Sequence, residues 1–490
     1  MVAVVEGSFM TAQRSTLASR VLAGGIQLML TQGITIITYF LAQRLILSTL
    51  TKEANGELFA VRRIADLLVI VLVDAGLNGI AMRRIIQDPS STQRVLSTTV
   101  MFRLVMWIVG TMICMLTGWL MHASLADLVM WCVFLLISVR SGLIRFTFEL
   151  PYRAHVRFGI VNMLAIVDAA MFLGLIYFYR TQLNPSTIIF ASVLSAIPGF
   201  ALLALYDRGR TIRPKWASVT LLRSMLLEAV PIIITSVLVS FHDKIDAMML
   251  DWFSTPLEVG IFGAAYNALS PLTAAIPSTM AMAIVPAVAR LAREDMDACR
   301  RFATTGLRFL IVIAIGVSTV FSTLTGAVIT IVSKNRYADN GIHFFTFLWM
   351  PVAIFMLVYV HELNIALGQQ RKNFLTASML AGITIVSGLI LIPMHHAYGA
   401  ILAKLFAVGC AAAVSYVVIH RVLDLSVDLW FVVRAGAAIA VCCAAAAILP
   451  GILGQAWAAG VNVVVFLATM IGLRIVNRGD IDLIRRLLTK

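Results

Sequence analysis

The stretch SFHDKIDAMML (Ser240–Leu250) places three charged side chains in a sequence that is apolar on both sides. Asp243, Lys244 and Asp246 fall where a membrane-spanning helix is expected. Each charge at the centre of such a helix costs about 2.5–3.5 kcal/mol on an insertion scale. Asp243 and Asp246 share one helix face because they are three residues apart. The sequence therefore predicts that this face meets protein or water rather than lipid.

The composition of the whole chain indicates an integral membrane protein. Of the 490 residues, 60% are hydrophobic and 13% are charged, and the mean hydropathy is +0.95. A soluble domain is about 25% charged. The net charge of +14 would suggest nucleic acid in a soluble protein, but here we expect no nucleic-acid partner. The six cysteines have neither metal nor disulfide-framework spacing and are interpreted as small apolar residues. We also expect no metal site, cofactor or catalytic residue.

Apolar runs of about 20 residues recur along the chain and predict an all-α protein with about 14 transmembrane helices. The first twenty residues lack a signal-peptide pattern, so the first run is expected to stay as a helix. Lys and Arg gather in alternate connections, which predicts that both termini are cytoplasmic. The predicted segments are an N-terminal segment (1–20), a six-helix N-lobe (21–206), a basic linker (207–228), a six-helix C-lobe (229–420), an extra helix pair (421–476) and a basic tail (477–490).

Further charges inside predicted spans mark a wet interior. Ionisable residues in a bilayer normally face a bundle interior or a cavity and mark a substrate or ion path. Spread over both lobes, they predict a large water-filled cavity between two six-helix lobes. Other interpretations stay open: Arg62 and Arg63 as snorkelling residues, Arg140 as an inner-end anchor, and the two aspartates of the opening stretch as packing ion pairs. The additional charged residues are Arg62, Arg63, Asp66, Asp74, Arg103, Arg140, Asp168 and Lys404.

Glycine and proline interrupt the predicted eighth span, GIFGAAYNALSPLTAAIPSTMAMAIVP (260–286). Interrupted helices are tolerated at membrane depth where they line a cavity or move. Gly260, Pro271 and Pro277 are therefore candidates for gating. Static kinks packed within the protein are the alternative interpretation.

Two passages resemble Wzx-type polysaccharide flippases. The first, TKEANGELFAVRRIADLLVIVLVDAGLNGIAMRRII (51–86), has an acidic-Gly turn, an Asp-Gly-Leu motif and a following Arg. The second, HDKIDAMMLDWFSTPLEVGIFGAAYNAL (242–269), has an Asp, an apolar stretch and a Glu-Val-Gly-Ile motif, and the two passages echo one another faintly. The residues that carry the resemblance are Gly56, Asp74, Gly76, Leu77, Arg83, Arg84, Asp246, Glu258, Val259, Gly260, Ile261, Phe262 (in place of the usual Tyr) and Ala265.

The resemblance implies the multidrug/oligosaccharidyl-lipid/polysaccharide (MOP) exporter superfamily, with two six-helix lobes around a V-shaped cavity and alternating access. It implies that the cargo is an undecaprenyl-pyrophosphate-linked oligosaccharide flipped across the bacterial inner membrane, for exopolysaccharide, capsule or O-antigen synthesis. A polysaccharide polymerase, export machinery and membrane lipid are the further partners expected. No G-x-x-x-x-G-K-[ST] motif is visible, so an ion or cargo gradient is the expected drive.

Roles for the charged residues follow from this cargo. Arg62, Arg63, Arg140 and Lys244 are candidates for binding its anionic pyrophosphate, because charge pairing is strong in low dielectric. The acidic residues are candidates for proton or cation coupling, or for holding the cations in place; they are Asp66, Asp74, Asp168, Asp243 and Asp246.

Two other functions stay open. A cation-coupled drug exporter of the same superfamily would favour an acidic, aromatic cavity, whereas bases are at least as frequent as acids in these spans. A membrane-embedded glycan polymerase or transferase is disfavoured by the short outside loops. The segment Asp480–Asp482 (DID) imitates a glycosyltransferase metal motif, but it lies in a basic tail that favours an interfacial helix.

Overall fold

A computed structural model describes most of the chain, and every regular element in the described part is helical. This confirms the all-α prediction. The described residues are 30–69 (without 32), 77–120, 124–138, 145–154, 158–207, 213–269, 294–423 and 429–473, together with 273, 288, 291 and 292.

Seven described helical segments are long and apolar enough to cross a membrane. Large apolar side chains are exposed on them or beside them, for example Trp119 (69% exposed) and Ile471 (75% exposed), as expected of surfaces that face lipid. The chain is thus a multi-pass integral membrane protein, while the count of about 14 helices and the orientation of the termini stay predictions. The seven are Pro89–Ile113, Pro185–Leu203, Met296–Thr323, Ala338–Ala366, Arg371–Arg421, Trp430–Leu453 and Gln455–Gly472, with shorter apolar helices at Gly33–Thr49 and Asn162–Phe178.

The chain divides into two compact units, and two helices pass from one unit to the other. Unit 1 takes residues up to Leu50 and Val61–Val237, and unit 2 takes Thr51–Ala60 and the residues from Leu238. Helix α2 (Lys52–Val69) therefore begins in unit 2, and α9 (Val219–Phe253) ends there. The predicted lobe boundaries at 206 and 229 stay predictions.

Unit 1 is held by an apolar core at the ends of several helices. Leu77 and Ile80 of α3, Leu96 of α4 and Leu150 of α6 are almost completely buried in this core, together with Met225 of α9. Arg84 of α3 also reaches Glu228 of α9, with 3.0 Å between Nη2 and Oε2. Besides the helix Gly33–Thr49 and the parts of α2 and α9 that belong to it, the described helices of unit 1 are α3 (Leu77–Gln87), α4 (Thr92–Leu120), α5 (Leu125–Ser138), α6 (Arg145–Ala154), α7 (Phe158–Phe178) and α8 (Pro185–Asp207), with short turns η2 (Pro89–Ser91) and η4 (Pro214–Trp216).

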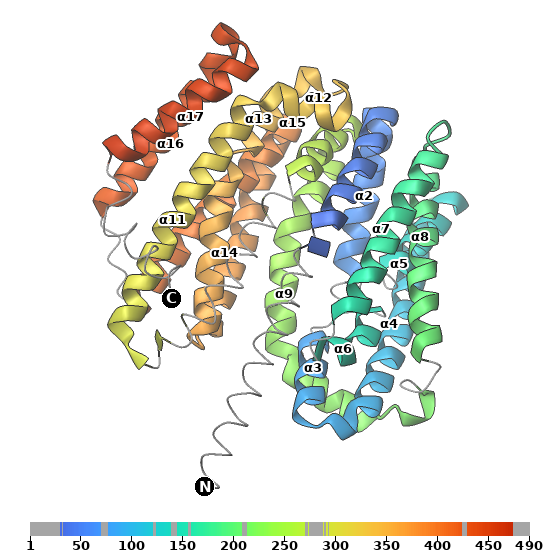
Figure 1. Ribbon diagram of the computed structural model, residues 1–490. Coiled ribbons are helices and arrows are strands. Elements are labelled where there is room, and N and C mark those ends of the chain that lie inside the picture. The colour runs from blue at the N-terminus through green and yellow to red at the C-terminus, as the bar shows by residue number, and fades with distance from the viewer. Residues whose placement is uncertain are drawn as a thin grey trace. The chain divides into compact units, whose positions relative to one another are not determined.

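Unit 2 has a larger core in which α11 packs against α14, α16 and α17 (Figure 1). Leu310 of α11, Phe355 of α14 and Cys442 of α16 are each about 0–1% exposed there. The buried Asn462 of α17 donates a 2.6 Å hydrogen bond to Thr323 of α11. Besides a helix over 256–269, the elements are α11 (Met296–Thr323), α12 (Thr325–Ser333), η5 (Ala338–Asn340), α13 (Gly341–Phe347), α14 (Met350–Ala366), α15 (Gln370–Leu423), α16 (Leu429–Leu453) and α17 (Gln455–Gly472).

Helix α15 is two helices joined at a sharp bend. Its 54 residues are enough for two crossings, since one crossing takes about 20 residues. The bend is at His396, whose φ of 51° lies in the left-handed region that side chains rarely adopt. Glu258 supports it by accepting a 3.1 Å hydrogen bond from the backbone N–H of Ala397. The bend brings residues 370–395 and 397–423, the two legs of α15, alongside each other.

Candidate functional site

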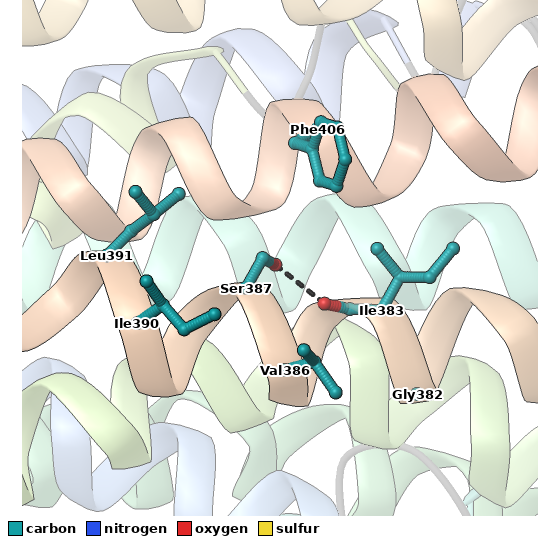
Figure 2. Close-up of a pocket in the computed structure, with 7 residues that line it drawn as sticks. All are labelled: Gly382, Ile383, Val386, Ser387, Ile390, Leu391 and Phe406. Atoms are coloured by element: carbon teal, nitrogen blue, oxygen red, sulfur yellow. Dashed lines mark hydrogen bonds between the residues drawn. The ribbon is translucent and has the colours of Figure 1, made fainter.

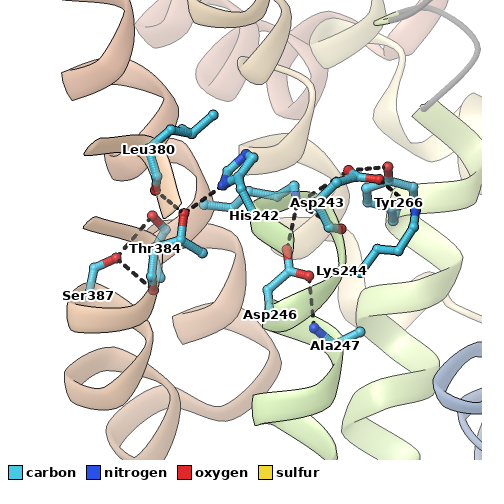
Figure 3. A network of polar contacts seen from close by, with 11 residues as sticks. His242, Asp243, Lys244, Asp246, Ala247, Tyr266, Leu380, Thr384 and Ser387 are labelled. Carbon is cyan, nitrogen blue, oxygen red and sulfur yellow. Dashed lines mark hydrogen bonds and ion pairs between the residues drawn. The ribbon is translucent and has the colours of Figure 1, made fainter. Parts of the chain in front are cut away.

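The opening stretch Ser240–Leu250 lies on the part of α9 that belongs to unit 2, and its charges meet a charge from α15. Lys404 Nζ lies 2.6 Å from Asp246 Oδ2 and 3.7 Å from Asp243 Oδ1. Lys244 Nζ lies 3.1 Å from Asp243 Oδ2. The structure therefore brings two carboxylates and two ammonium groups together, and we call these four residues the charge cluster (Figure 3).

The four side chains of the charge cluster differ in their exposure to solvent. The side chains of Lys404 and Asp246 are 3% and 2% exposed, so their ion pair is sealed within unit 2. The Asp243 side chain is 35% exposed, and Lys244 is 10% exposed. Asp243 is thus the carboxylate of the cluster that solvent, a proton or a ligand can reach most easily.

Neighbouring polar groups fix the two carboxylates. The hydroxyl of Tyr266, on the helix over 256–269, donates a 2.7 Å hydrogen bond to Asp243 Oδ1. The ring of the same tyrosine lies 5.4 Å from Lys404 Nζ, within cation–π range. The backbone N–H of Ala247 donates a 2.8 Å hydrogen bond to Asp246 Oδ1. The two carboxylates are therefore positioned by nearby cations and by directed hydrogen-bond donors together.

A histidine extends the network toward the first leg of α15. His242 Nδ1 lies 2.6 Å from the hydroxyl of Thr384, and both side chains are buried. That hydroxyl also donates a 2.7 Å hydrogen bond to the carbonyl of Leu380. A threonine has one hydroxyl proton, so Nδ1 of His242 must carry the proton in its own contact. The imidazole therefore binds α15 as a donor.

The charge balance determines what the cluster can do. Two charges taken out of water are tolerated only when paired and hydrogen-bonded, and removing one partner leaves a costly buried charge. The four formal charges cancel, so this arrangement does not itself attract an anion or a cation strongly. An added proton, cation or anionic group would upset the balance and redistribute the ion pairs.

The other predicted charged site residues that are described lie in unit 1. Arg63 of α2 is buried, and Arg62 beside it is close enough to Asp66, one turn along, for their charges to interact. Asp168 of α7 is buried against α8, where a Cβ added to Gly199 would meet its carboxylate. Snorkelling alone does not account for Arg63, because only 7% of this residue is exposed.

Four predicted site residues lie outside the described residues: Asp74, Arg140, Pro271 and Pro277. The remaining gating candidate, Gly260, is buried in the helix over 256–269.

Sequence reasoning missed two members of the site. Lys404 was visible as an intramembrane charge, but nothing in the sequence paired it with a residue 158 positions away. Tyr266 carries no charge and looked like one aromatic residue among many. Arg103, whose role the sequence left open, is fully buried and donates to Asn78 (2.8 Å) and to Thr147.

An apolar groove of about 490 Å³ lies between the two legs of α15 (Figure 2). Its one hydroxyl, on Ser387, donates a 2.6 Å hydrogen bond to the carbonyl of Ile383 in its own helix. The groove therefore offers no polar group to a charged cargo. The lining residues are Gly382, Ile383, Val386, Ser387, Ile390, Leu391 and Phe406.

Solved structures with similar folds are transporters and a flippase. An inward-facing multidrug resistance MATE family transporter of the MOP superfamily matches with a TM-score of 0.66 and 13% identity, over 80% of this chain and 96% of its own. The lipid II flippase MurJ, in an inward closed conformation, matches with a TM-score of 0.66 and 12% identity, over 91% of this chain and 98% of its own. A MOP superfamily transporter from Pyrococcus furiosus matches with a TM-score of 0.59 and 14% identity, over 83% of this chain and 95% of its own.

These likenesses establish the class of fold, which this chain shares with a MATE family transporter and with the flippase MurJ. No curated protein matches the sequence of the chain. A family profile described as "Polysaccharide biosynthesis protein" matches residues 21–292, which is more than half of the chain. The chain belongs to this polysaccharide biosynthesis family, and the resemblance to Wzx-type proteins is thereby confirmed.

Proposed function

We propose that this protein moves an undecaprenyl-pyrophosphate-linked oligosaccharide from the inner to the outer leaflet of a bacterial inner membrane by alternating access. The observation that carries the proposal is membership of the polysaccharide biosynthesis family over residues 21–292. The fold shared with the lipid II flippase MurJ supports it. The product serves exopolysaccharide, capsule or O-antigen synthesis, beside a polymerase and export machinery.

Cationic side chains at membrane depth suit the pyrophosphate of such a cargo. We assign its binding to Arg62, Arg63, Arg140 and Lys244. Among them, Lys244 forms an ion pair with the accessible Asp243, with 3.1 Å between Nζ and Oδ2. An arriving phosphate group would compete with this carboxylate for the ammonium, because charge-assisted hydrogen bonds to phosphate are strong in low dielectric.

Coupling can use the same exchange. A proton or small cation that neutralises Asp243 frees Lys244 for the cargo, while the sealed pair of Asp246 and Lys404 keeps the remainder balanced. We assign Asp66, Asp74 and Asp168 to coupling or to charge pairing in the other unit. We assign Gly260, Pro271 and Pro277 to gating. We also propose that both termini lie in the cytoplasm.

Reconstitution in liposomes tests the proposal. The protein is incorporated with a lipid-pyrophosphate-linked oligosaccharide, and movement of the saccharide between leaflets is measured for wild type, Arg63→Ala and Lys244→Ala. Losing one charge-assisted contact to the cargo should slow movement about tenfold or more. Arg180→Ala is the matched control, because this exposed arginine stacks on Tyr177 at a helix end, 4.3 Å from the ring.

The outcomes separate the alternatives. Movement by wild type and its loss in Arg63→Ala and Lys244→Ala, with folded protein verified, supports a flippase with a cationic site. Movement that both variants preserve keeps the flippase and rejects the assigned residues. Efflux of a cationic dye without saccharide movement would favour the drug exporter.

A further inference from the structure

The first turns of α2 and the start of the helix over 256–269 pack backbone against backbone within unit 2. A Cβ added to Gly56 would lie 1.9 Å from the carbonyl oxygen of Pro256 and 2.8 Å from the nitrogen of Gly260. A Cβ added to Gly260 would lie 1.8 Å from the carbonyl oxygen of Lys52 and 3.2 Å from the nitrogen of Gly56. The opposing atoms belong to helix backbones and cannot swing aside, so only glycine fits at both positions.

These contacts are reciprocal. Gly260 follows Gly56 by 204 residues, and Pro256 follows Lys52 by the same 204 residues. Each glycine meets the carbonyl that is equivalent to the one met by the other. Such an exchange of equivalent partners is the signature of a two-fold axis. The faint echo between the two passages of sequence therefore corresponds to a local two-fold that passes between the two glycines.

The polar contacts around the axis are not symmetric. Asn55 is 2% exposed, and its Nδ2 donates to the carbonyl of Gly260 at 3.0 Å and to the hydroxyl of Tyr337 at 3.3 Å. The equivalent position in the second passage is Val259, which has no such donor.

Lys52 adds a second polar tie on the same side of the axis. Its Nζ donates to Asn340 Oδ1 at 2.8 Å and lies 5.4 Å from the ring centre of Tyr337. The start of α2 is thus tied to residues 337–340 by side chains of α2 itself.

Chain connectivity gives this contact a consequence. Residues 51–60 belong to unit 2, and the same helix continues in unit 1 from Val61. Any rearrangement of unit 1 relative to unit 2 must therefore either carry this segment along or pull it away from the helix over 256–269.

We propose that residues 52–60 and 256–263, with the ties from Asn55 and Lys52, form a releasable latch that closes in one state of the transport cycle and opens in another. The glycines set its closed geometry, and Asn55 is a positioning residue that sets how easily it opens. This inference rests on the proposed function, and it needs one experiment with cargo and one without.

The first experiment locks the latch. Lys52→Cys and Asn340→Cys, in a chain whose six native cysteines are replaced, are joined by a bifunctional methanethiosulfonate reagent long enough to stand in for the Lys52 side chain. The cross-link should stop saccharide movement, and reduction should restore it. Thr330→Cys with Asn335→Cys is the control pair, because these exposed residues contact one another at 2.6 Å at the C-terminal end of α12 in unit 2. Full movement with the latch cross-linked would overturn the proposal, whereas movement by the reduced protein tests the proposed function by itself.

The second experiment measures opening of the latch in the absence of cargo. Spin labels at Glu53→Cys and Ala338→Cys, both exposed positions, report the distance between the start of α2 and residues 337–340. Gly260→Ala should add a longer distance, because its Cβ meets the Lys52 carbonyl. Asn55→Val copies the residue at the equivalent position 259 and should raise the open fraction about tenfold or more, because it removes both buried hydrogen bonds of Asn55.

Gly409→Ala is the matched control, because this helical glycine of unit 2 has open space around it. It should leave the distances unchanged. Unchanged distances in both Gly260→Ala and Asn55→Val would show that no latch opens, whatever the cargo experiment gives.

Discussion

The helix over 256–269 takes part in two regions of unit 2 that are built on opposite principles. Through Tyr266 it reaches the charge cluster, where long side chains meet and their charges cancel. Through Gly260 it meets α2, where the contact depends on side chains being absent. We expect a proton or an anion to rearrange the ion pairs of the first region without moving a helix. The second can change only if two backbones separate.

The difference indicates how the two regions divide the work of a transport cycle. Ion pairs respond to chemistry, because each partner can exchange one counter-charge for another. A backbone contact responds to shape and is either made or broken. We therefore expect the charge cluster to sense cargo or coupling ion, and the latch to report which conformation the chain has reached.

The largest effect is expected from breaking the sealed ion pair. Lys404→Met leaves the carboxylate of Asp246 buried without its 2.6 Å partner and should cost about 3–5 kcal/mol of stability. The measurement is the unfolding transition of the detergent-purified protein. Adding Asp246→Asn to Lys404→Met should restore most of the loss, because the buried charge is then removed as well. A double variant no more stable than Lys404→Met would contradict a balanced cluster.

The next effect is expected at the latch. Gly56→Ala forces a Cβ into the Pro256 carbonyl, and overpacking of this kind costs about 1–3 kcal/mol. Gly56→Ala and Gly260→Ala together should cost less than the sum of the two, because one Cβ already separates the backbones. Thermal unfolding of the two single variants and the double variant measures this coupling. Strict additivity would mean that the two glycines do not share one contact.

A smaller effect is expected from Tyr266→Phe, which separates the two regions. The phenyl ring keeps the contact with Phe59 of the latch, where the ring centres are 5.9 Å apart. It loses the 2.7 Å hydrogen bond to Asp243, which should cost about 1 kcal/mol because this carboxylate is partly solvated.

The two measurements for Tyr266→Phe should diverge. Saccharide movement should slow, while the spin-label distance across the latch should match that of wild type. An altered distance would mean that the cluster and the latch are a single device.

The sequence predicted the class of fold and the helix face that carries Asp243 and Asp246. Charges in apolar runs are conspicuous, and the spacing of Asp243 and Asp246 assigns them to one helix face. In the structure one cation, Lys404, lies within 3.7 Å of Asp243 and 2.6 Å of Asp246. That Lys404 is this cation could not be predicted, because the bend at His396 determines which residues of α15 face α9, and bends of this kind carry no periodic signal.

The latch was less predictable still. A glycine in a helix is read as a weak position, costing about 1 kcal/mol relative to alanine. Nothing in GEL (56–58) or GIF (260–262) distinguishes a glycine against a backbone from one in open space, such as Gly409. The faint echo between the two passages was the available signal, and it acquires meaning only once both helices are placed.

The smallest effect is expected from a carboxylate that lies outside both regions and in water. Asp88 accepts hydrogen bonds from the backbone N–H of Ser90 (3.1 Å) and from its hydroxyl (2.6 Å), at the start of η2. The Ser90 hydroxyl is the main cause of a lowered pKa for Asp88. Since the folded pKa lies below the unfolded value of about 3.9, this stabilisation is complete above that pH and is lost as the pH falls through the folded pKa.

Asp88→Ala lacks the stabilisation at every pH. The melting temperatures of wild type and variant should therefore differ slightly at pH 7 and converge as the solution is acidified. Thermal unfolding at a series of pH values measures this convergence, with Asp246→Asn as the buried comparison. A difference in melting temperature that does not change with pH would mean that Asp88 stabilises the turn through its geometry and not through its charge.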